Sequence, residues 1–213
     1  MYKNYIKRLL DFVLSFLAII LFSWLILLIG IVIKVTSKGP VFFLQKRIGI
    51  YKKEFYIIKF RTMYIHTPQS VPTHLLQNPD QYITPVGRFL RWSSLDELPQ
   101  LFNIFIGDMA IVGPRPALWN QYDLINERDK YNANSVRPGL TGWAQVNGRD
   151  EIPISLKSKL DGEYIAKMGI GFDLKCLVKT VTCVMKHDGI REGAVKVDNM
   201  ETLQKADIEQ ITF

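Results

Sequence analysis

An apolar segment near the N-terminus constrains this chain more than any other feature of its sequence. Residues Phe12 to Ile33 contain no charged side chain and consist mostly of Leu, Ile, Phe and Val. The segment is long enough to cross the hydrocarbon core of a bilayer as a helix. A cleavable signal peptide would have a shorter apolar core followed by a small-residue cleavage site. This segment instead continues directly into Lys34–Pro40. We therefore expect a retained membrane helix.

Basic residues flank the apolar segment on both sides, in a chain of 213 residues with a formal net charge of +7. Before it lie Lys3, Lys7 and Arg8, and after it lie Lys34, Lys38, Lys46 and Arg47. The excess of cytoplasmic Lys and Arg that orients spanning helices therefore indicates no direction. A helix that enters and leaves on the cytoplasmic face explains both flanks. A simple spanning helix with some basic residues outside explains them equally well.

The cysteines and histidines indicate no disulfide and no metal site. Cys176 and Cys183 are seven residues apart in a predicted helix, about two turns, which is too far for a disulfide. Core positions in a reducing compartment suit them better. The three histidines, His66, His74 and His187, are scattered, with neither zinc-ligand spacing nor a partner for a triad.

The pattern downstream predicts a domain with two strands and several helices. Residues 41–46 and 54–61 are rich in aromatic and β-branched residues and indicate two strands. Residues 66–85 carry four prolines and indicate a loop. Helices are expected at 85–92, from about 94, and at 117–130, 154–168 and 172–187, followed by a polar tail.

Asp96 and Glu97 are the leading candidates for chemistry. Ser94 and Glu97 have the spacing of a capping box, which explains both acids without any catalytic role. Neighbours on a helix point about 100° apart, so these two cannot act as a facing acid and base. A division of labour fits better, in which one carboxylate attacks and the other binds a metal. The positive end of the helix would keep Asp96 ionised, as a nucleophile requires.

A set of cations lies in or beside segments with restricted backbone, and it suits phosphate. Arg115 lies between two prolines, and a planar guanidinium can hold a phosphate through two hydrogen bonds. Lys59 and Arg61 are two apart on a predicted strand and would share a face. A solvated strand edge explains that pair as well. The full set is Lys59, Arg61, Arg88, Arg91, Arg115, Arg137 and Arg149. The chain has no recognised nucleic-acid motif, and its glycine-rich loop, residues 137–149, lacks the standard nucleotide-cradle patterns.

Taken in order, these segments resemble the bacterial sugar transferases, the small monotopic phosphoglycosyl transferases. The resemblance covers about residues 1 to 188. It rests on the apolar segment followed by Gly39–Phe42, on Lys59–Met63, on Ser94–Gln100, on Gly107–Met109, on Gly113–Pro116 and on residues 137–149. Such enzymes move a sugar-1-phosphate from a UDP-sugar to undecaprenyl phosphate, release UMP, pass through a covalent phosphosugar intermediate and need Mg²⁺.

The resemblance implies roles for particular residues. Asp96 would be the nucleophile, and Glu97, with Asp96, would hold Mg²⁺. Lys59, Arg91 and Arg115 would lie near phosphate. The substrate-binding set would also include Arg61, Arg88, Arg137, Gln145, Arg149 and the recurrent family acid Asp173.

The resemblance also implies a fold and a location. We expect an α+β, mostly helical protein at the cytoplasmic face of the bacterial inner membrane. Residues 1–38 would form a membrane-embedded re-entrant helix. Residues 39–188 would form a catalytic domain with a β-hairpin and amphipathic helices at the membrane surface, and residues 189–213 would form a flexible tail. The family usually breaks its helix at Ser-Pro, where this chain has Ser23-Trp24. Ser23 could still favour a bend by bonding back to a carbonyl, and a straight span remains the alternative.

Two other functions remain open from the residues. A membrane-anchored nucleotide-sugar hydrolase would use water in place of the lipid, although water needs no membrane anchor. A non-catalytic scaffold that binds anionic lipid explains the charge but gives no role to the ordered motifs. The resemblance favours an N-acetylated, often 6-deoxy, UDP-sugar over UDP-glucose or UDP-galactose as the donor. It implies that the enzyme starts the synthesis of a surface glycan such as a capsule, and it permits a homodimer. No nucleic-acid partner is expected.

Overall fold

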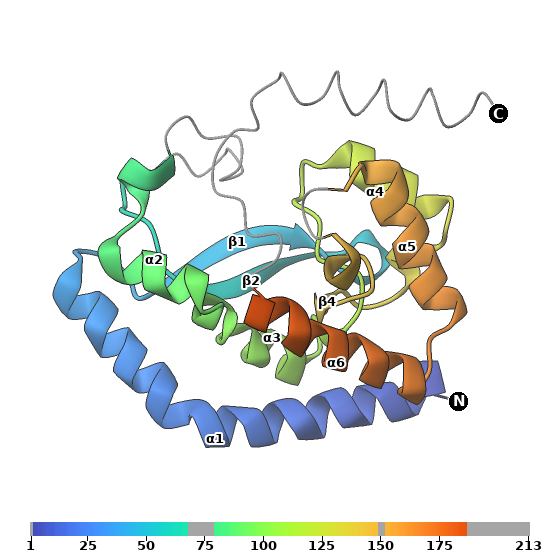
Figure 1. The fold of residues 1–213 in the computed structure, drawn as a ribbon, viewed down its shortest axis with the longest axis horizontal. Helices are drawn as coiled ribbons and strands as arrows, with labels where there is room; N and C mark the ends of the chain where they lie inside the picture. Colours follow the sequence, from blue (N-terminus) through green and yellow to red (C-terminus); the bar gives the residue numbers. More distant parts are fainter. Residues whose placement is uncertain (1, 68–78, 149–151, 187–213) are drawn as a thin grey trace.

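A computed structural model describes residues 2–67, 79–148 and 152–186 of the chain (Figure 1). Its helices are α1 (Lys7–Thr36), α2 (Pro85–Trp92), α3 (Gln100–Ile106), α4 (Tyr122–Asp129), α5 (Ile154–Ala166) and α6 (Ile170–Lys186). Its strands are β1 (Phe42–Ile48), β2 (Glu54–Phe60), β3 (Ala110–Val112) and β4 (Gly139–Thr141). The predicted tail, Arg149 and most of the proline-rich loop lie outside the described residues.

The predicted mostly helical α+β fold is confirmed, and so is the hairpin. Strands β1 and β2 pair antiparallel with Phe42 opposite Phe60. The sequence did not indicate the second sheet, in which β3 and β4 pair parallel with Val112 opposite Thr141. These strands of three residues are too short for a visible hydrophobic pattern. Cys176 and Cys183 are both free thiols, as the sequence predicted. Cys176 is buried in the core, whereas Cys183 is half-buried.

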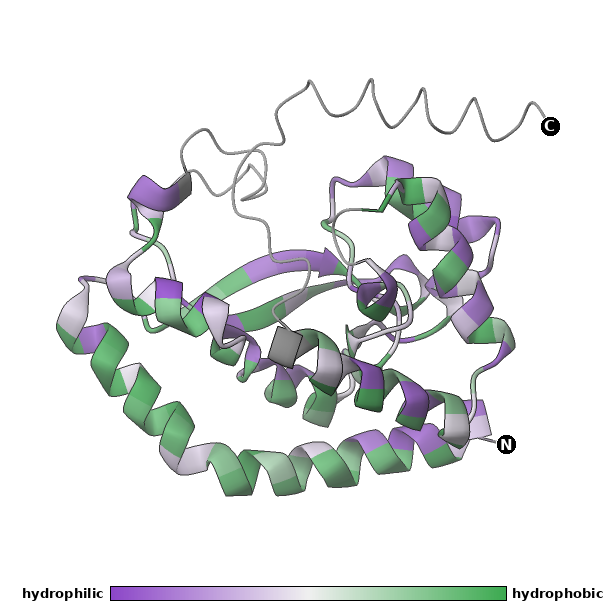
Figure 2. Cartoon of the chain, viewed as in Figure 1, coloured by the Kyte–Doolittle hydropathy of each residue, from purple (hydrophilic) through white to green (hydrophobic). Residues whose placement is uncertain are grey.

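Helix α1 is long and apolar enough, by length and composition, to cross a membrane. Figure 1 shows it as a bowed helix whose first half runs along α3 and α6 and whose second half turns toward α2. It is hydrophobic over most of its length (Figure 2), and many of its large apolar side chains are exposed. Near its middle the Ser23 hydroxyl donates to the carbonyl of Ile20 at 2.8 Å, the back-bond that the sequence predicted.

The two halves of α1 pack on the domain through different side chains. The first half buries Lys7, Asp11 and Ser15, which are spaced one turn apart, whereas the second buries Ile29 and Ile33. The latter pack with Phe60 of β2 and Leu90 of α2. Both ends of α1 are therefore fastened to the same domain. Its exposed apolar side chains lie on the faces of the helix that do not contact the domain.

One predicted helix begins later than expected. Residues 117–130 were predicted as a single helix, but α4 starts at Tyr122. The Ile48 amide donates to the carbonyl of Ala117 at 2.9 Å, and Leu118 pairs with Arg47 as an isolated bridge. Leu118 is buried in that strand-like contact, which its apolar character alone does not distinguish from the face of a helix.

Candidate active site

The acid pair lies on a single turn of 3₁₀ helix, Leu95–Glu97, which precedes α3. Ser94 has left-handed backbone angles (φ 57°, ψ 15°), and its side chain makes no capping hydrogen bond. The predicted capping box is therefore wrong, because an N-cap residue needs an extended backbone to reach the first turn. A left-handed non-glycine residue is uncommon and is worth examining for function. Glu97 is not used in capping and can interact elsewhere.

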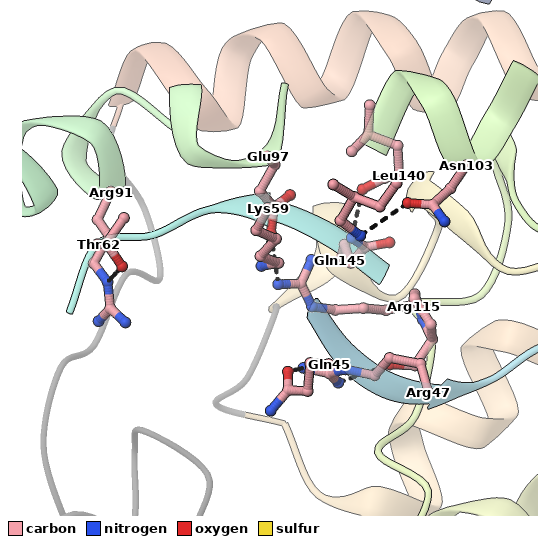
Figure 3. Close-up of polar contacts among 12 residues, drawn as sticks. Gln45, Arg47, Lys59, Thr62, Arg91, Glu97, Asn103, Arg115, Leu140 and Gln145 are labelled. Carbon is pink, nitrogen blue, oxygen red and sulfur yellow. Dashed lines mark hydrogen bonds and ion pairs between the residues drawn. The ribbon is translucent and has the colours of Figure 1, made fainter. Parts of the chain in front are cut away.

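Glu97 binds two cations that come from distant parts of the chain. Its Oε1 lies 2.7 Å from Lys59 Nζ and 3.1 Å from Arg115 Nη2. The side chains of Glu97 and Lys59 are 20% and 17% exposed, whereas Arg115 is 39% exposed. Figure 3 shows the Arg115 guanidinium reaching toward Lys59 and Glu97 from the side of β1. The group is thus half-buried, with Arg115 on its open side.

Asn103 holds α3 against β2. Helix α3 follows the acid pair, and β2 carries Lys59. Asn103 Oδ1 accepts from the Ile58 amide at 2.9 Å (Figure 3). Its Nδ2 donates to the carbonyl of Tyr56 at 2.8 Å. A side-chain amide can satisfy both groups of a strand edge in this way. Asn103 is buried, and sequence reasoning did not select it. The available signal was a lone amide inside the apolar run Leu101–Ile106.

Arg91 joins the same region from α2. Thr84 caps this helix, because its side chain accepts from the Gly87 amide, and Pro85 occupies the first turn as predicted. Arg91 Nε donates to Thr62 Oγ1 at 2.9 Å. Helix α2 lies very close to the segment that follows β2, because a Cβ on Gly87 would fall 2.0 Å from the carbonyl oxygen of Thr62.

The two carboxylates have opposite electrostatic environments. Burial raises the pKa of Glu97, but the charges and hydrogen bonds of Lys59 and Arg115 outweigh burial and hold that pKa well below its usual range. Burial also raises the pKa of Asp96, where the charge of Glu97 adds to burial and the three cations oppose it without prevailing. The pKa of Asp96 is therefore shifted upward, opposite to the effect that the positive end of a helix would have. Asp96 is the more easily protonated acid.

We call Asp96, Glu97, Lys59, Arg91 and Arg115 the acid-pair cluster. With all five groups charged, its net charge is +1, from three cations and two carboxylates. A partly open cluster of this kind attracts an anion such as a diphosphate. The described residues contain no group of three His, Cys, Asp or Glu that could hold a metal. Mg²⁺ is commonly bound by one or two carboxylates together with substrate phosphates and waters, and Asp96 and Glu97 fit that role.

Other predicted site residues have structural partners in this conformation. Arg61 is buried, and its Nη2 donates to the Ser37 carbonyl and hydroxyl at 2.9 and 2.6 Å, at the C-terminal end of α1. Strand β2 ends at Phe60, and Arg61 contacts Ser37 whereas Lys59 contacts Glu97, so the two cations do not act together as their spacing predicted. Arg137 donates to the Gly107 carbonyl at 2.8 Å, and Gln145 to the Leu140 carbonyl at 3.1 Å.

Two further predicted residues stand apart, and a third is not described. Arg88 is exposed on α2. Asp173, on α6, lies in a separate cluster, where its Oδ2 accepts from Lys7 Nζ and from the Tyr2 hydroxyl, both at 2.6 Å. The Tyr164 hydroxyl lies 2.8 Å from Asp173 Oδ1 and 3.0 Å from the carbonyl of Val112. Arg149 lies outside the described residues.

The sequence was compared with known proteins. A family described as bacterial sugar transferase matches residues 2–187. A UDP-glucose:undecaprenyl-phosphate glucose-1-phosphate transferase from Xanthomonas campestris pv. campestris is 41% identical over 84% of this chain and 38% of the relative. An uncharacterized sugar transferase, EpsL, from Bacillus subtilis (strain 168) is 38% identical over 88% of the chain and 91% of the relative.

A third relative differs in the sugar that its name gives. A UDP-N-acetylgalactosamine-undecaprenyl-phosphate N-acetylgalactosaminephosphotransferase from Aeromonas hydrophila is 36% identical over 88% of this chain and 45% of the relative. The chain thus spans less than half the length of the Xanthomonas and Aeromonas relatives and most of the length of the Bacillus one. All the residues of the acid-pair cluster lie inside the family match.

Proposed function

The chain belongs to the bacterial sugar transferase family, and on that premise we propose that it transfers a sugar-1-phosphate from a UDP-sugar to undecaprenyl phosphate and releases UMP. The observation that carries the proposal is the contact of Glu97 with Lys59 and Arg115, beside Asp96 and within the matched region. Two relatives are named as transferases of this kind, which supports the same reaction here.

We propose that the reaction proceeds in two displacements at one phosphorus. A carboxylate oxygen of Asp96 attacks the phosphorus that bears the sugar, and the bond from that phosphorus to the oxygen bridging to UMP breaks. UMP leaves with the bridging oxygen, and the sugar phosphate stays on Asp96. An oxygen of undecaprenyl phosphate then attacks the same phosphorus and displaces the carboxylate. The products are UMP, undecaprenyl-diphospho-sugar and free enzyme.

The remaining members of the acid-pair cluster would act on charge. Lys59 and Arg115 are within reach of one carboxylate oxygen, and a diphosphate that enters there can take over some of their hydrogen bonds. Guanidinium groups fixed in place before the reaction stabilise the charge that develops on transferred phosphoryl oxygens. Burial and the charge of Glu97 raise the pKa of Asp96, and a carboxylate with a raised pKa is a stronger nucleophile when it is ionised.

We further propose that Mg²⁺ binds at Glu97, assisted by Asp96 and the phosphates of the donor. When bound, the ion would neutralise the diphosphate and its leaving group. The proposal is supported by the carboxylate pair on one turn, since two carboxylates with substrate oxygens suit this ion. Glu97 would then exchange part of its contact with the two cations for contact with the metal.

The membrane acceptor gives α1 a role. We propose that α1 is re-entrant and that the catalytic domain lies on the cytoplasmic face of the inner membrane. Supporting observations are the bowed shape of α1 in Figure 1 and the attachment of both its ends to one domain, through Lys7 and Asp11 at the start and Arg61 with Ser37 at the end. A helix so attached brings the headgroup region close to the domain.

The names of the relatives bear on the donor sugar and on the glycan. The relatives that match at similar identity carry the names of glucose and N-acetylgalactosamine transferases. Two relatives, one of them the exopolysaccharide production protein ExoY of Rhizobium meliloti (strain 1021), align over most of their own length. We propose an N-acetylated or neutral hexose UDP-sugar as donor, for the first step of a surface glycan.

UMP release tests the reaction. The purified full chain in nanodiscs would be given undecaprenyl phosphate, Mg²⁺ and a panel of UDP-sugars that includes UDP-glucose, UDP-galactose and their N-acetylated and 6-deoxy forms. We expect sustained UMP release with one donor or a narrow group of donors. Without the lipid we expect at most one UMP per enzyme molecule, and in Asp96→Asn we expect none. Sustained multiple turnover without lipid would identify a hydrolase. Binding to anionic vesicles without turnover, equal in Asp96→Asn, would support the lipid-binding scaffold instead.

A further inference from the structure

The turn that carries Arg115, Gly113–Pro116, is held by hydrogen bonds to its backbone. The Gly113 amide donates to the carbonyl of Thr141 at 2.8 Å, and the carbonyl of Pro114 accepts from the Gly139 amide at 2.9 Å. These two bonds join the turn to β4 beyond the end of β3. The next two carbonyls of the turn are bound by side chains from other elements.

Two arginines bind those carbonyls. Arg128 Nη1, on α4, donates to the carbonyl of Arg115 at 2.9 Å. Arg47 Nη1, on β1, donates to the carbonyl of Pro116 at 3.0 Å. In Figure 3, Arg47 lies beside Arg115 at the edge of β1. The carbonyls of Pro114, Arg115 and Pro116 thus each accept a hydrogen bond, and these three bonds fix the backbone of Arg115.

Arg128 is in turn held by Asp161 of α5. Arg128 Nε and Nη2 lie 2.8 and 2.7 Å from Asp161 Oδ2, and the two side chains are only 4% and 1% exposed. The three nitrogens of one planar guanidinium therefore serve two partners, the carboxylate and the Arg115 carbonyl. A rigid fork of this kind fixes direction as well as distance, which a lysine cannot do.

The buried ion pair of Arg128 and Asp161 is not explained by stability alone. Taking two charges out of water is costly, and well-packed apolar residues often replace a buried ion pair without loss. An apolar pair could join α4 to α5, but it could not donate to the Arg115 carbonyl. We propose that Arg128 and Asp161 are positioning residues, which act through the backbone of Arg115 to hold its guanidinium against Glu97. This inference rests on the proposed function, since it concerns the same reaction.

A small displacement of Arg115 would be enough to slow transfer. Its Nη2 lies 3.1 Å from Glu97 Oε1, so even a modest shift of the turn would break that contact. Misplacement of a group by about 1 Å can lower a rate on the order of a hundredfold. The expected defect is therefore in turnover, and the fold is retained where the packing is repaired.

The test uses a packing replacement, Arg128→Met together with Asp161→Leu, in the full chain in nanodiscs. The readouts are the melting temperature and kcat and KM for UMP release. We expect a melting temperature close to that of the wild type and a fall in kcat of about 10- to 100-fold. Leu124→Ala, on the buried face of α4, is the matched control. It should lower the melting temperature while kcat measured well below that temperature stays near the wild-type value.

A second background identifies the route of the effect. In Arg115→Ala the guanidinium is already absent, so the packing replacement should cause little further loss. Arg128→Lys, which keeps the ion pair but loses the fork, should fold and should also be slow. Wild-type kcat in the folded packing replacement or in Arg128→Lys would overturn the inference. An equal fold-loss with and without Arg115 would also overturn it. Failure of the wild type to release UMP would instead contradict the proposed function.

Discussion

Glu97 and Asp173 both belong to motif segments, yet the protein surrounds the two acids differently. The Glu97 side chain is 20% exposed, and its two cations contact one oxygen, with Arg115 on the open side. Asp173 is 11% exposed, and both of its oxygens have partners within 2.8 Å. Those partners are Lys7 and Tyr2 near the N-terminus and Tyr164 of α5.

The difference separates a site that can exchange partners from one that cannot. A substrate phosphate can approach Glu97 because the acid-pair cluster is partly open and carries excess positive charge. At Asp173 a ligand would have to displace an ion pair and two tyrosine hydroxyls, from a position that fastens α1 to α6. An acid in a motif can thus serve either purpose, and its partners distinguish the two.

The largest expected effect is the loss of turnover in Asp96→Asn. Removing a nucleophile should lower the rate of UMP release by at least about a thousandfold. The melting temperature at pH 8 should stay the same or rise. A raised pKa means that the folded protein disfavours the ionised form, so a neutral amide removes a destabilising charge above that pKa. Turnover that survives in Asp96→Asn at more than a few per cent would assign the chemistry to another residue.

Asp173→Asn should reverse this pattern. The substitution leaves Lys7 buried without its carboxylate, which costs about 3–5 kcal/mol in the free energy of unfolding. Thermal unfolding in detergent should show a clearly lower midpoint, while kcat and KM measured well below it change by less than about threefold. Asp123→Asn, at an exposed position of α4, is the matched control. A large rise in KM at unchanged stability would return Asp173 to the substrate site, as the sequence predicted.

The acid limb of the pH–rate profile should respond to Arg91. The charge of Arg91 lowers the pKa of Asp96, so its removal in Arg91→Gln raises that pKa. Less of the carboxylate is then ionised at a given pH, and the acid limb of kcat moves to higher pH, by up to about one unit. Lys53→Gln, exposed in the β1–β2 connection, should leave the limb in place. A shift to lower pH would contradict the assignment of that limb to Asp96.

The smallest expected effect concerns Ser23. Because α1 is fastened at both ends, the loss of one hydroxyl in Ser23→Ala should leave its topology unchanged. Single cysteines in place of Lys3 and Lys38, in a background without Cys176 and Cys183, can be labelled with a membrane-impermeant maleimide. We expect no labelling in intact cells and labelling of both after permeabilisation, with or without Ser23→Ala. Labelling of only one end in intact cells would establish a straight span.

Local patterns predicted the elements that local patterns determine. The hairpin, α2 with its proline in the first turn, α5 and α6 were all predicted within a few residues. The acid pair was selected as the chemical candidate because of its motif. The start of α3 was predicted too early, because the left-handed Ser94 is set by its surroundings and not by its residue type.

What the sequence could not supply is the choice of partners over long distances. Lys59 and Arg115 reach Glu97 from 38 and 18 residues away, and Lys7 reaches Asp173 from 166 residues away. No periodicity encodes such pairings. The cations were therefore predicted as one group, whereas the structure gives Arg61 and Arg137 separate roles at helix ends. The buried links made by Asn103 and Arg128 were missed for the same reason.

The most direct measurement is the mass of the intact protein after incubation with its UDP-sugar and Mg²⁺ in the absence of undecaprenyl phosphate. We predict an added mass equal to one sugar phosphate, located on Asp96 by fragmentation, absent in Asp96→Asn and lost when the lipid phosphate is added. Full turnover to undecaprenyl-diphospho-sugar with no such adduct, under quenching fast enough to capture it, would contradict the covalent role of Asp96 and indicate direct transfer between the two substrates.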